Sequence, residues 1–387
     1  MTNSMNYGNL RGLTLTELEH LAASLGEQKF RARQLFEWLY RKEADSFDQM
    51  TTLSKSFREK LSGVAHIESL KLVTESHSAD DGTTKFLFEL ADGKRIESVL
   101  IPPKTAFASK EAGTEEEQKR LTLCVSTQVG CALDCAFCAT ASMGIIRNLT
   151  AGEILDQVIQ ARKISGKTIT NLVYMGMGEP MMNYEQTMSS IEIISTAMGI
   201  AAKRITVSTA GVAPKIRQMA DENRKMKLAV SLHSLDDAVR SRLMPINKKY
   251  PVTELIDAVR YYYKRLKQRV TFEYILFDGV NDRDADIKLL IRLSNSMPCK
   301  FNIIPYHSIA FTHPTGMGAE LRPTPAARAE EFVERLRVAH ATVFVRSSAG
   351  EDIDAACGQL AVKAERGRSL RRGSSARQSH HPDLTPA

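Results

Sequence analysis

The sequence has no long hydrophobic run. No stretch of about 18 apolar residues occurs in its 387 residues, and the mean hydropathy is −0.23, which excludes a membrane-spanning helix. The first twelve residues are polar and lack the apolar core of a signal peptide. We therefore expect no membrane contact and a cytoplasmic location, where thiols stay reduced.

Composition excludes several further classes. With 43% hydrophobic and 25% charged residues, the chain is an ordinary globular protein, and not a disordered chain, a collagen-like repeat or a disulfide-stapled miniprotein. A net charge of +7 suits a polyanion such as RNA. Residues 366–387 hold five arginines and one aspartate, however, a net of +4. Charge alone is therefore a weak indication of an RNA partner.

The N-terminal part is predicted to be a small helical domain. Residues 13 to about 62 carry apolar residues at helical spacing, and Thr14 with Glu17 forms a candidate capping box. Trp38, the only tryptophan, is expected in the core of this domain rather than stacked on a nucleotide base.

A β-hairpin and a linker are expected next. Residues 84–90 and 95–101 alternate between apolar and polar, and Asp92-Gly93 between them is typical of a hairpin turn. Residues 104–119 are polar and predict an exposed linker. Residues 366–387 are rich in Arg, Ser, Gly and Pro and predict a disordered tail.

Between the linker and the tail, short apolar strands alternate with amphipathic helices, which predicts a parallel α/β barrel or a doubly wound sheet. One such helix, 151–164, opens with a capping box of Thr150 and Glu153. The candidate strands are 121–126, 171–176, 204–208, 227–233, 270–277, 300–306 and 341–346. The predicted division is an N-terminal domain at 1–80, hairpin and linker at 81–118, a core at 119–363 and a tail at 364–387.

Four of the six cysteines lie within fifteen residues, and Cys131, Cys135 and Cys138 form a C-x3-C-x2-C motif. In a reducing compartment such spacing indicates metal or redox chemistry. Three thiolates from one loop suit a 4Fe-4S cluster with one iron left open for another ligand. The alternative is a zinc site completed by Cys124 or a distant histidine, although the second pair of ligands that structural zinc sites use is missing.

The motif and its surroundings resemble a known family. C-x3-C-x-aromatic-C after the first strand is the signature of radical S-adenosylmethionine (SAM) enzymes. The strings LCVSTQVGCALDCAFCATA, YMGMGEPMMNY, ITVSTAGVAPKI, AVSLHS and GEDIDAACGQL resemble the radical SAM RNA adenosine methyltransferases of the RlmN/Cfr type, over about residues 85–363. The resemblance implies a partial (β/α)6 radical SAM barrel with the cluster at its C-terminal mouth, a small N-terminal helical domain and a β-hairpin extension.

Carried over residue by residue, the resemblance assigns Cys131, Cys135 and Cys138 to the cluster. The open iron would chelate the amino and carboxylate groups of SAM. The implied SAM contacts, all at or near strand ends, are Gly178, Glu179, Ser208, Ser231, Leu232, His233 and His307. His307 stands where the commoner pattern IPWN has an asparagine, and an imidazole can also donate a hydrogen bond.

The resemblance also assigns the reacting groups. Cys357 would accept a methyl group from one SAM, and Cys124 would later release the product by forming a transient disulfide. Glu97 would take the proton from the ring. Without the resemblance, both cysteines would be taken as buried structural residues, as Cys299 still is, and Glu97 as a solvated carboxylate on a strand.

The implied reaction is methylation of adenine C2 in 23S ribosomal RNA, and in tRNA as well, with two SAM molecules per turnover. An aromatic C–H of adenine is too unreactive for direct methylation, which explains a radical cofactor. We expect a monomer and an electron donor such as flavodoxin. The alternatives are methylation at C8, a radical SAM reaction on a substrate other than RNA, and a metal-bound RNA-binding module without activity.

Overall fold

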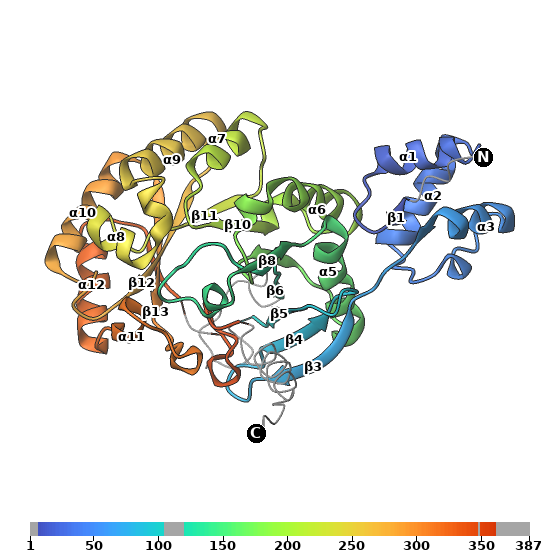
Figure 1. Ribbon diagram of the computed structural model, residues 1–387. Coiled ribbons are helices and arrows are strands. Elements are labelled where there is room, and N and C mark those ends of the chain that lie inside the picture. The colour runs from blue at the N-terminus through green and yellow to red at the C-terminus, as the bar shows by residue number, and fades with distance from the viewer. Residues whose placement is uncertain (1–6, 104–119, 347–348, 361–387) are drawn as a thin grey trace, which may run out of the picture.

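A computed structural model describes residues 7–103, 120–346 and 349–360. It consists of a helical N-terminal domain beside a larger α/β body (Figure 1). The predicted linker and tail lie outside the described residues, and the domain bounds stay a prediction. None of the described helices is long and apolar enough to cross a membrane.

The N-terminal domain packs three helices, and a short parallel pair of strands, β1 and β2, joins its ends. The predicted Thr14–Glu17 capping box begins the first helix. Trp38 is only partly buried: its indole N–H donates to Thr52 Oγ1 at 2.7 Å, and Lys42 Nζ lies 3.9 Å from its ring centroid. The expectation that Trp38 lies in the core is thus met in part, because its side chain packs against the buried residues without being fully buried itself. The bounds are α1 Leu15–Ser24, α2 Lys29–Tyr40, α3 Lys55–Val64, β1 Gly8–Asn9 and β2 Ala65–His66.

One ten-stranded sheet forms the body, in the order β14-β13-β12-β11-β10-β9-β6-β5-β4-β3. In this order, the neighbouring strands between β14 and β6 are parallel to one another. Beyond β6, the strands β5, β4 and β3 continue the sheet as antiparallel neighbours. The parallel strands are β6 Thr122–Cys124, β9 Asn171–Tyr174, β10 Ile205–Thr209, β11 Lys227–Ser231, β12 Val270–Leu276, β13 Cys299–Pro305 and β14 Val343–Val345.

The predicted hairpin is present as β4 (Thr84–Glu89) and β5 (Arg95–Ile101). A third strand, β3 (Lys71–His77), extends it and was not foreseen, because its residues are almost all exposed and leave no buried stripe in the sequence. A separate two-stranded sheet pairs β7 (Gln128–Gly130) with β8 (Ile145–Asn148) around the loop that carries the cysteine motif.

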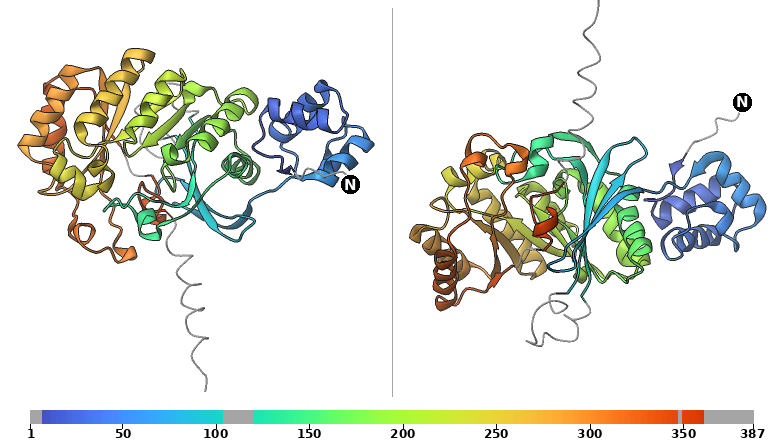
Figure 2. Two further views of the ribbon diagram at one scale, coloured as in Figure 1. Left: turned by 45° about the horizontal axis from the view of Figure 1, so that its top comes forward. Right: turned by 90° about the horizontal axis from the view of Figure 1, so that it is seen from below.

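Helices cover the outer face of the curved parallel sheet (Figure 2). The predicted capping box of Thr150 and Glu153 begins α5. The strand–helix alternation brings the carboxyl ends of the parallel strands to one edge, where barrel active sites lie. The helices are α5 Ala151–Ser165, α6 Tyr184–Ala197, α7 Ala213–Asp221, α8 Asp237–Leu243, α9 Val252–Leu266, α10 Asp284–Ser296, α11 Met317–Glu320 and α12 Ala326–Val338.

Arg11 joins the N-terminal domain to the body. Its buried guanidinium forms an ion pair with Asp156 on α5, bonds to the carbonyl of Ala44 at 3.0 Å and pairs with Asp45 at 2.8 Å. The backbones of Arg11 and Gly152 also pack closely together. A Cβ at Gly152 would lie only 2.2 Å from the Arg11 carbonyl oxygen. The two parts are therefore held by a buried charge pair and a backbone contact that only glycine permits.

We expect Gly152→Ala to lower the midpoint of thermal unfolding by several degrees, because the added methyl overpacks this junction at a cost of about 1–3 kcal/mol. The matched control is Gly63→Ala in α3, where the added Cβ meets nothing within 4 Å; it should leave the midpoint unchanged or raise it slightly. Calorimetry that showed the same effect for both variants would contradict a tight junction.

Candidate active site

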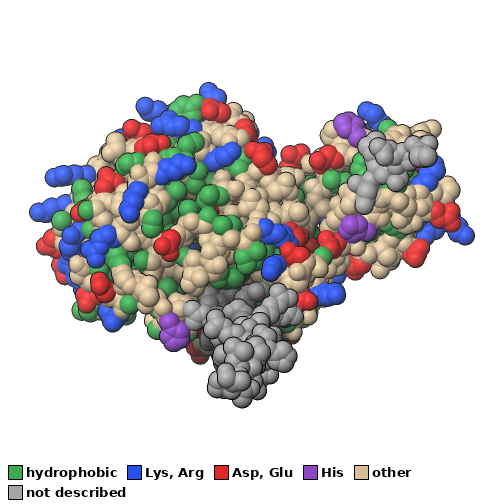
Figure 3. Space-filling model, in the orientation of Figure 1, with side chains coloured by type: hydrophobic (Ala, Val, Ile, Leu, Met, Phe, Trp, Pro, Cys, Tyr) green, Lys and Arg blue, Asp and Glu red, His purple; other side chains and the backbone are tan. Residues whose placement is uncertain are grey.

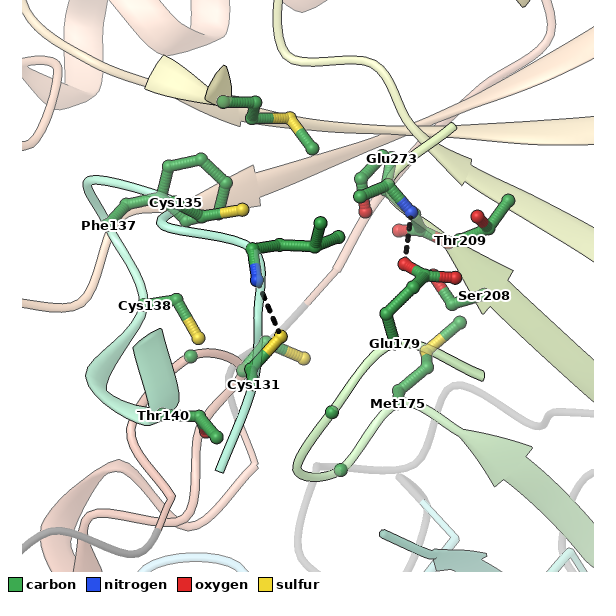
Figure 4. Close-up of a pocket in the computed structure, with 18 of the residues that line it drawn as sticks. Cys131, Cys135, Phe137, Cys138, Thr140, Met175, Glu179, Ser208, Thr209 and Glu273 are labelled. Atoms are coloured by element: carbon green, nitrogen blue, oxygen red, sulfur yellow. Dashed lines mark hydrogen bonds between the residues drawn. The ribbon is translucent and has the colours of Figure 1, made fainter. Parts of the chain in front are cut away.

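A cavity of about 150 Å³ lies at the carboxyl ends of the parallel strands. Its wall combines the motif loop, the strand ends and the C-terminal segment (Figure 4). The sequence-predicted residues that line it are Cys131, Cys135, Cys138, Gly178, Glu179, Ser208, Ser231, His233 and Cys357. Glu97, Cys124, Leu232 and His307 are not among its lining residues.

The three thiols of the motif loop share this cavity (Figure 4). Burial raises the pKa of the Cys131 thiol to about 12 and that of Cys135 well above its usual value, and nearby thiolate charges raise both further. Three desolvated thiolates need a strongly positive, thiophilic partner. The donor set therefore fits a 4Fe-4S cluster, which takes its three cysteines on three different irons.

The zinc alternative finds no support. No set of three His, Cys, Asp or Glu side chains in the described part of the chain is arranged to hold a metal ion. Cys124, one of the two proposed kinds of fourth ligand besides a distant histidine, lies buried on β6 and outside the cavity lining.

Glu179 points a buried carboxylate into the cavity (Figure 4). Its oxygens accept backbone N–H groups of Ala210 at 2.7 Å and Met181 at 3.0 Å, and burial raises its pKa to about 6. Gly178 before it has φ of +96°, and a Cβ there would lie 2.5 Å from Gln128 Cβ. This turn therefore needs glycine, and it presents a carboxylate that can pair with a ligand ammonium.

His233 is held as a neutral imidazole. Its Nδ1 accepts the backbone N–H of Ile275 at 3.0 Å, and its ring packs edge-on against Phe137 with centroids 4.7 Å apart. Burial, reinforced by the charge of Arg240, lowers its pKa to about 3. The hydrogen therefore sits on Nε2, which can donate to a ligand in the cavity.

Arg240 organises the neighbouring strand ends and was missed by the sequence analysis. This fully buried side chain donates to the carbonyl oxygens of Ala210 at 2.7 Å, Ser231 at 3.0 Å and Leu232 at 3.0 Å. The Leu232 side chain is fully buried, and it contributes to the site through this backbone contact. No local motif marks an arginine that acts across two strands.

Cys357 reaches the cavity on a segment that packs against the motif loop. The Ala139 N–H donates to the Gly358 carbonyl at 2.6 Å, and Thr140 Oγ1 donates to the Leu360 carbonyl at 3.3 Å. Cys357 is exposed, whereas Cys124 is buried and burial raises its pKa to about 12, with a further rise from the charge of a Cys357 thiolate. Each thiol is therefore within electrostatic reach of the other.

Glu97 is buried, so its interpretation as a solvated strand carboxylate is wrong. Its Oε1 lies 3.5 Å from Lys85 Nζ, and the same ammonium donates to the carbonyl of Asp354 at 3.1 Å. Lys85 thus connects Glu97 with the segment that carries Cys357, although Glu97 itself lies outside the cavity lining.

His307 also contacts the C-terminal segment. Its Nδ1 lies 3.1 Å from Glu351 Oε1, and the neighbouring Ser308 carbonyl accepts Gln359 Nε2 at 3.3 Å. In this structure His307 thus lies where it supports the Cys357 segment, and its predicted contact with SAM stays a prediction.

Comparisons with known proteins identify the family of this chain. Residues 125–291 match the model of the radical SAM superfamily, and residues 8–67 match that of the ribosomal RNA large subunit methyltransferase N-terminal domain. A protein of Moorella thermoacetica named "Probable dual-specificity RNA methyltransferase RlmN" is 42% identical over 91% of this chain and 96% of its own length. The chain belongs to the RlmN family of radical SAM RNA methyltransferases.

Two further relatives agree. The "Dual-specificity RNA methyltransferase RlmN" of Marinobacter nauticus is 39% identical over 94% of this chain and 95% of its own. The crystal structure of a radical SAM methyltransferase from Sphaerobacter thermophilus is 44% identical, covers 91% of this chain and 98% of its own, and superposes with a TM-score of 0.80. The family and the partial barrel predicted from the motifs are thereby confirmed.

The neutral His233 gives this RlmN-family protein a specific pH dependence. The unfolded imidazole binds a proton near pH 6.5, but the folded one does so only near pH 3. Its contribution to stability is therefore present above pH 6.5 and is lost as pH falls toward 3. In His233→Asn, which tolerates the φ of +53°, the free energy of unfolding should fall less steeply over this range. Denaturant titrations at several pH values measure this free energy. The same dependence on pH in both proteins would contradict a buried neutral imidazole.

Proposed function

We propose that this protein methylates C2 of an adenosine in 23S ribosomal RNA, and of an adenosine in tRNA, through a methyl group carried on Cys357. The observation that carries the proposal is that Cys357 shares one cavity with the three thiols of the motif loop and with Glu179. The word "dual-specificity" in the names of its relatives and the match of residues 8–67 to a ribosomal RNA methyltransferase domain support RNA as the substrate.

Cys131, Cys135 and Cys138 would hold a 4Fe-4S cluster, and the cavity wall would hold SAM. The Glu179 carboxylate suits the ammonium of SAM, and Ser208, Ser231 and the Nε2–H of His233 supply further polar contacts. When bound, the cluster and two SAM molecules per turnover supply the methyl group and the radical chemistry that an unreactive ring carbon requires. Reduction of the cluster needs an external electron donor, for which flavodoxin is our candidate.

The two reacting thiols would have different roles. Cys357, exposed at the cavity, would accept the methyl group as a thiolate. After carbon–carbon bond formation, the Cys124 thiolate would attack the Cys357 sulfur. The bond from that sulfur to the transferred carbon would break, and the carbon would keep the electron pair and take up a proton to become the methyl group. This step leaves a disulfide between Cys124 and Cys357, which a cellular reductant must reset. Glu97 would take the ring proton. Its link through Lys85 to Asp354 keeps this carboxylate beside the Cys357 segment.

The target adenosine must leave its stack to reach the cavity, at a cost of a few kcal/mol. The N-terminal domain protrudes from the body and carries lysine and arginine side chains among acidic ones on its surface (Figure 3). We propose that its basic side chains bind the folded RNA at a distance from the cavity. We further propose that the protein acts as a monomer in the cytoplasm.

Mass analysis of adenosines tests the proposal against its alternatives. RNA incubated with the anaerobically reconstituted enzyme and SAM should yield 2-methyladenosine. 8-Methyladenosine would show the C8 reaction. Unmodified RNA with SAM cleavage would point to another substrate, and unmodified RNA without cleavage to a binding module.

The same reaction with Cys124→Ala should leave the protein covalently joined to RNA through Cys357, because the methyl carrier remains and the resolving thiol is missing. A nuclease-sensitive increase in the mass of the protein should therefore appear. The increase should be absent from the double variant that carries both Cys124→Ala and Cys357→Ala. Cys299→Ala is the matched control, since Cys299 is another buried free thiol, on β13, and it should release product normally. Normal yield of free methylated RNA from Cys124→Ala would contradict its role.

A further inference from the structure

Glu273 on β12 is a buried carboxylate for which the proposed function has no role. It lines the cavity and is only 5% exposed. Its Oε1 accepts Asn302 Nδ2 at 3.0 Å, but its Oε2 has no hydrogen-bond partner. Such an oxygen is costly to bury unless a donor meets it in some state of the protein.

Arg346, just after β14, lies next to this oxygen. Its Nη1 is 3.9 Å from Glu273 Oε2, beyond hydrogen-bond distance, and 3.7 Å from Met175 Sδ. The side chain is 29% exposed and also lines the cavity. Both of these contacts of the guanidinium are long ones.

The pair lies on the side of the reacting thiols. The positive charge of Arg346 lowers the pKa of Cys124, and the negative charge of a Cys357 thiolate is the largest cause of the raised pKa of Arg346. The negative charge of Glu179, by contrast, raises the pKa of the motif thiols Cys131 and Cys135. Glu273 and Arg346 line the same cavity as Cys357, so a base bonded to Cys357 would share that cavity with both side chains.

Adenine matches this pair. Its exocyclic amine is a donor next to a ring nitrogen acceptor, and Glu273 and Arg346 offer an acceptor next to donors. A phosphate would bring only acceptors and would meet the negative charge of Glu273. The SAM contacts proposed above are Glu179, Ser208, Ser231 and His233, and they do not include Glu273 or Arg346. Because SAM also carries an adenine, the affinity for SAM is measured separately in the test below.

We propose that Glu273 and Arg346 form the subsite that reads the edge of the target adenine. Glu273 Oε2 accepts the exocyclic amine, and the Arg346 guanidinium donates to the adjacent ring nitrogen. Asn302 is the positioning residue, because its bond to Oε1 turns the other oxygen toward the base. This inference rests on the proposed function and adds the residues that select adenine.

Glu273→Gln tests the subsite because Asn302 fixes the orientation of the new amide. Its oxygen takes the bond from Asn302, so its NH2 group replaces Oε2 and presents a donor to the amine of adenine. The substrates are two RNAs that differ at the target position, one with adenosine and one with purine riboside, which lacks the amine. Methylation rates of both RNAs, and the affinity for SAM without RNA, are measured for each protein.

The wild-type protein should methylate the adenosine RNA about 10- to 100-fold faster than the purine RNA, the size expected for a hydrogen bond to a charged group. Glu273→Gln should lose most of that preference while its affinity for SAM stays unchanged. The ratio of rates isolates the contact, because any intrinsic difference between the bases affects both proteins equally. Arg346→Lys, which keeps the charge but loses the planar fork, should slow methylation of both RNAs without changing SAM affinity.

Glu334→Gln on α12, an exposed carboxylate outside the cavity, is the matched control and should behave as wild type. An unchanged preference in Glu273→Gln would overturn this assignment alone. Weaker SAM binding with an unchanged preference would assign Glu273 to SAM instead of the target adenine. A wild-type protein that methylates neither RNA would overturn the proposed function and this subsite together.

Discussion

The site depends on one backbone contact between two distant segments of the chain. The Ala139 N–H donates to the Gly358 carbonyl at 2.6 Å, which docks the segment of Cys357 on the loop that holds the three motif thiols. Gly358 has φ of +88°, and a Cβ there would lie 3.1 Å from the Phe137 carbonyl oxygen. Cys357 and the three motif thiols can share a cavity only while these backbones stay this close.

Around this contact, three cationic side chains connect the remaining parts: Arg240 and Arg11 are buried, and Lys85 is partly buried. Arg240 ties two strand ends together, Lys85 joins Glu97 to the Cys357 segment, and Arg11 fastens the N-terminal domain to α5. A charge that is buried with its partners costs much to unpair. We infer that these three cations make the domain and the strand ends rigid, so that the cavity is preformed.

The sequence predicted most of this arrangement, because its motifs and periodicities are local. The parallel strands, both capping boxes and the hairpin are confirmed, since each is decided within about twenty residues of chain. Arg240, Glu273 and Arg346 were not predicted: their partners lie on other strands, and only the folded sheet brings them together. The solvated interpretation of Glu97 was wrong because β5 is covered on both faces, which alternation along one strand does not reveal.

The most direct test of the docked Cys357 segment is methylation of Cys357 in Gly358→Ala. Reconstituted protein should hold as much iron and sulfide as wild type, because all three motif cysteines remain. With SAM present, however, peptide mass analysis should show much less S-methylcysteine at Cys357, since the added Cβ is strained at this φ and pushes the segment off the loop. Methylation of Cys357 at the wild-type level would contradict the dependence of the site on this contact.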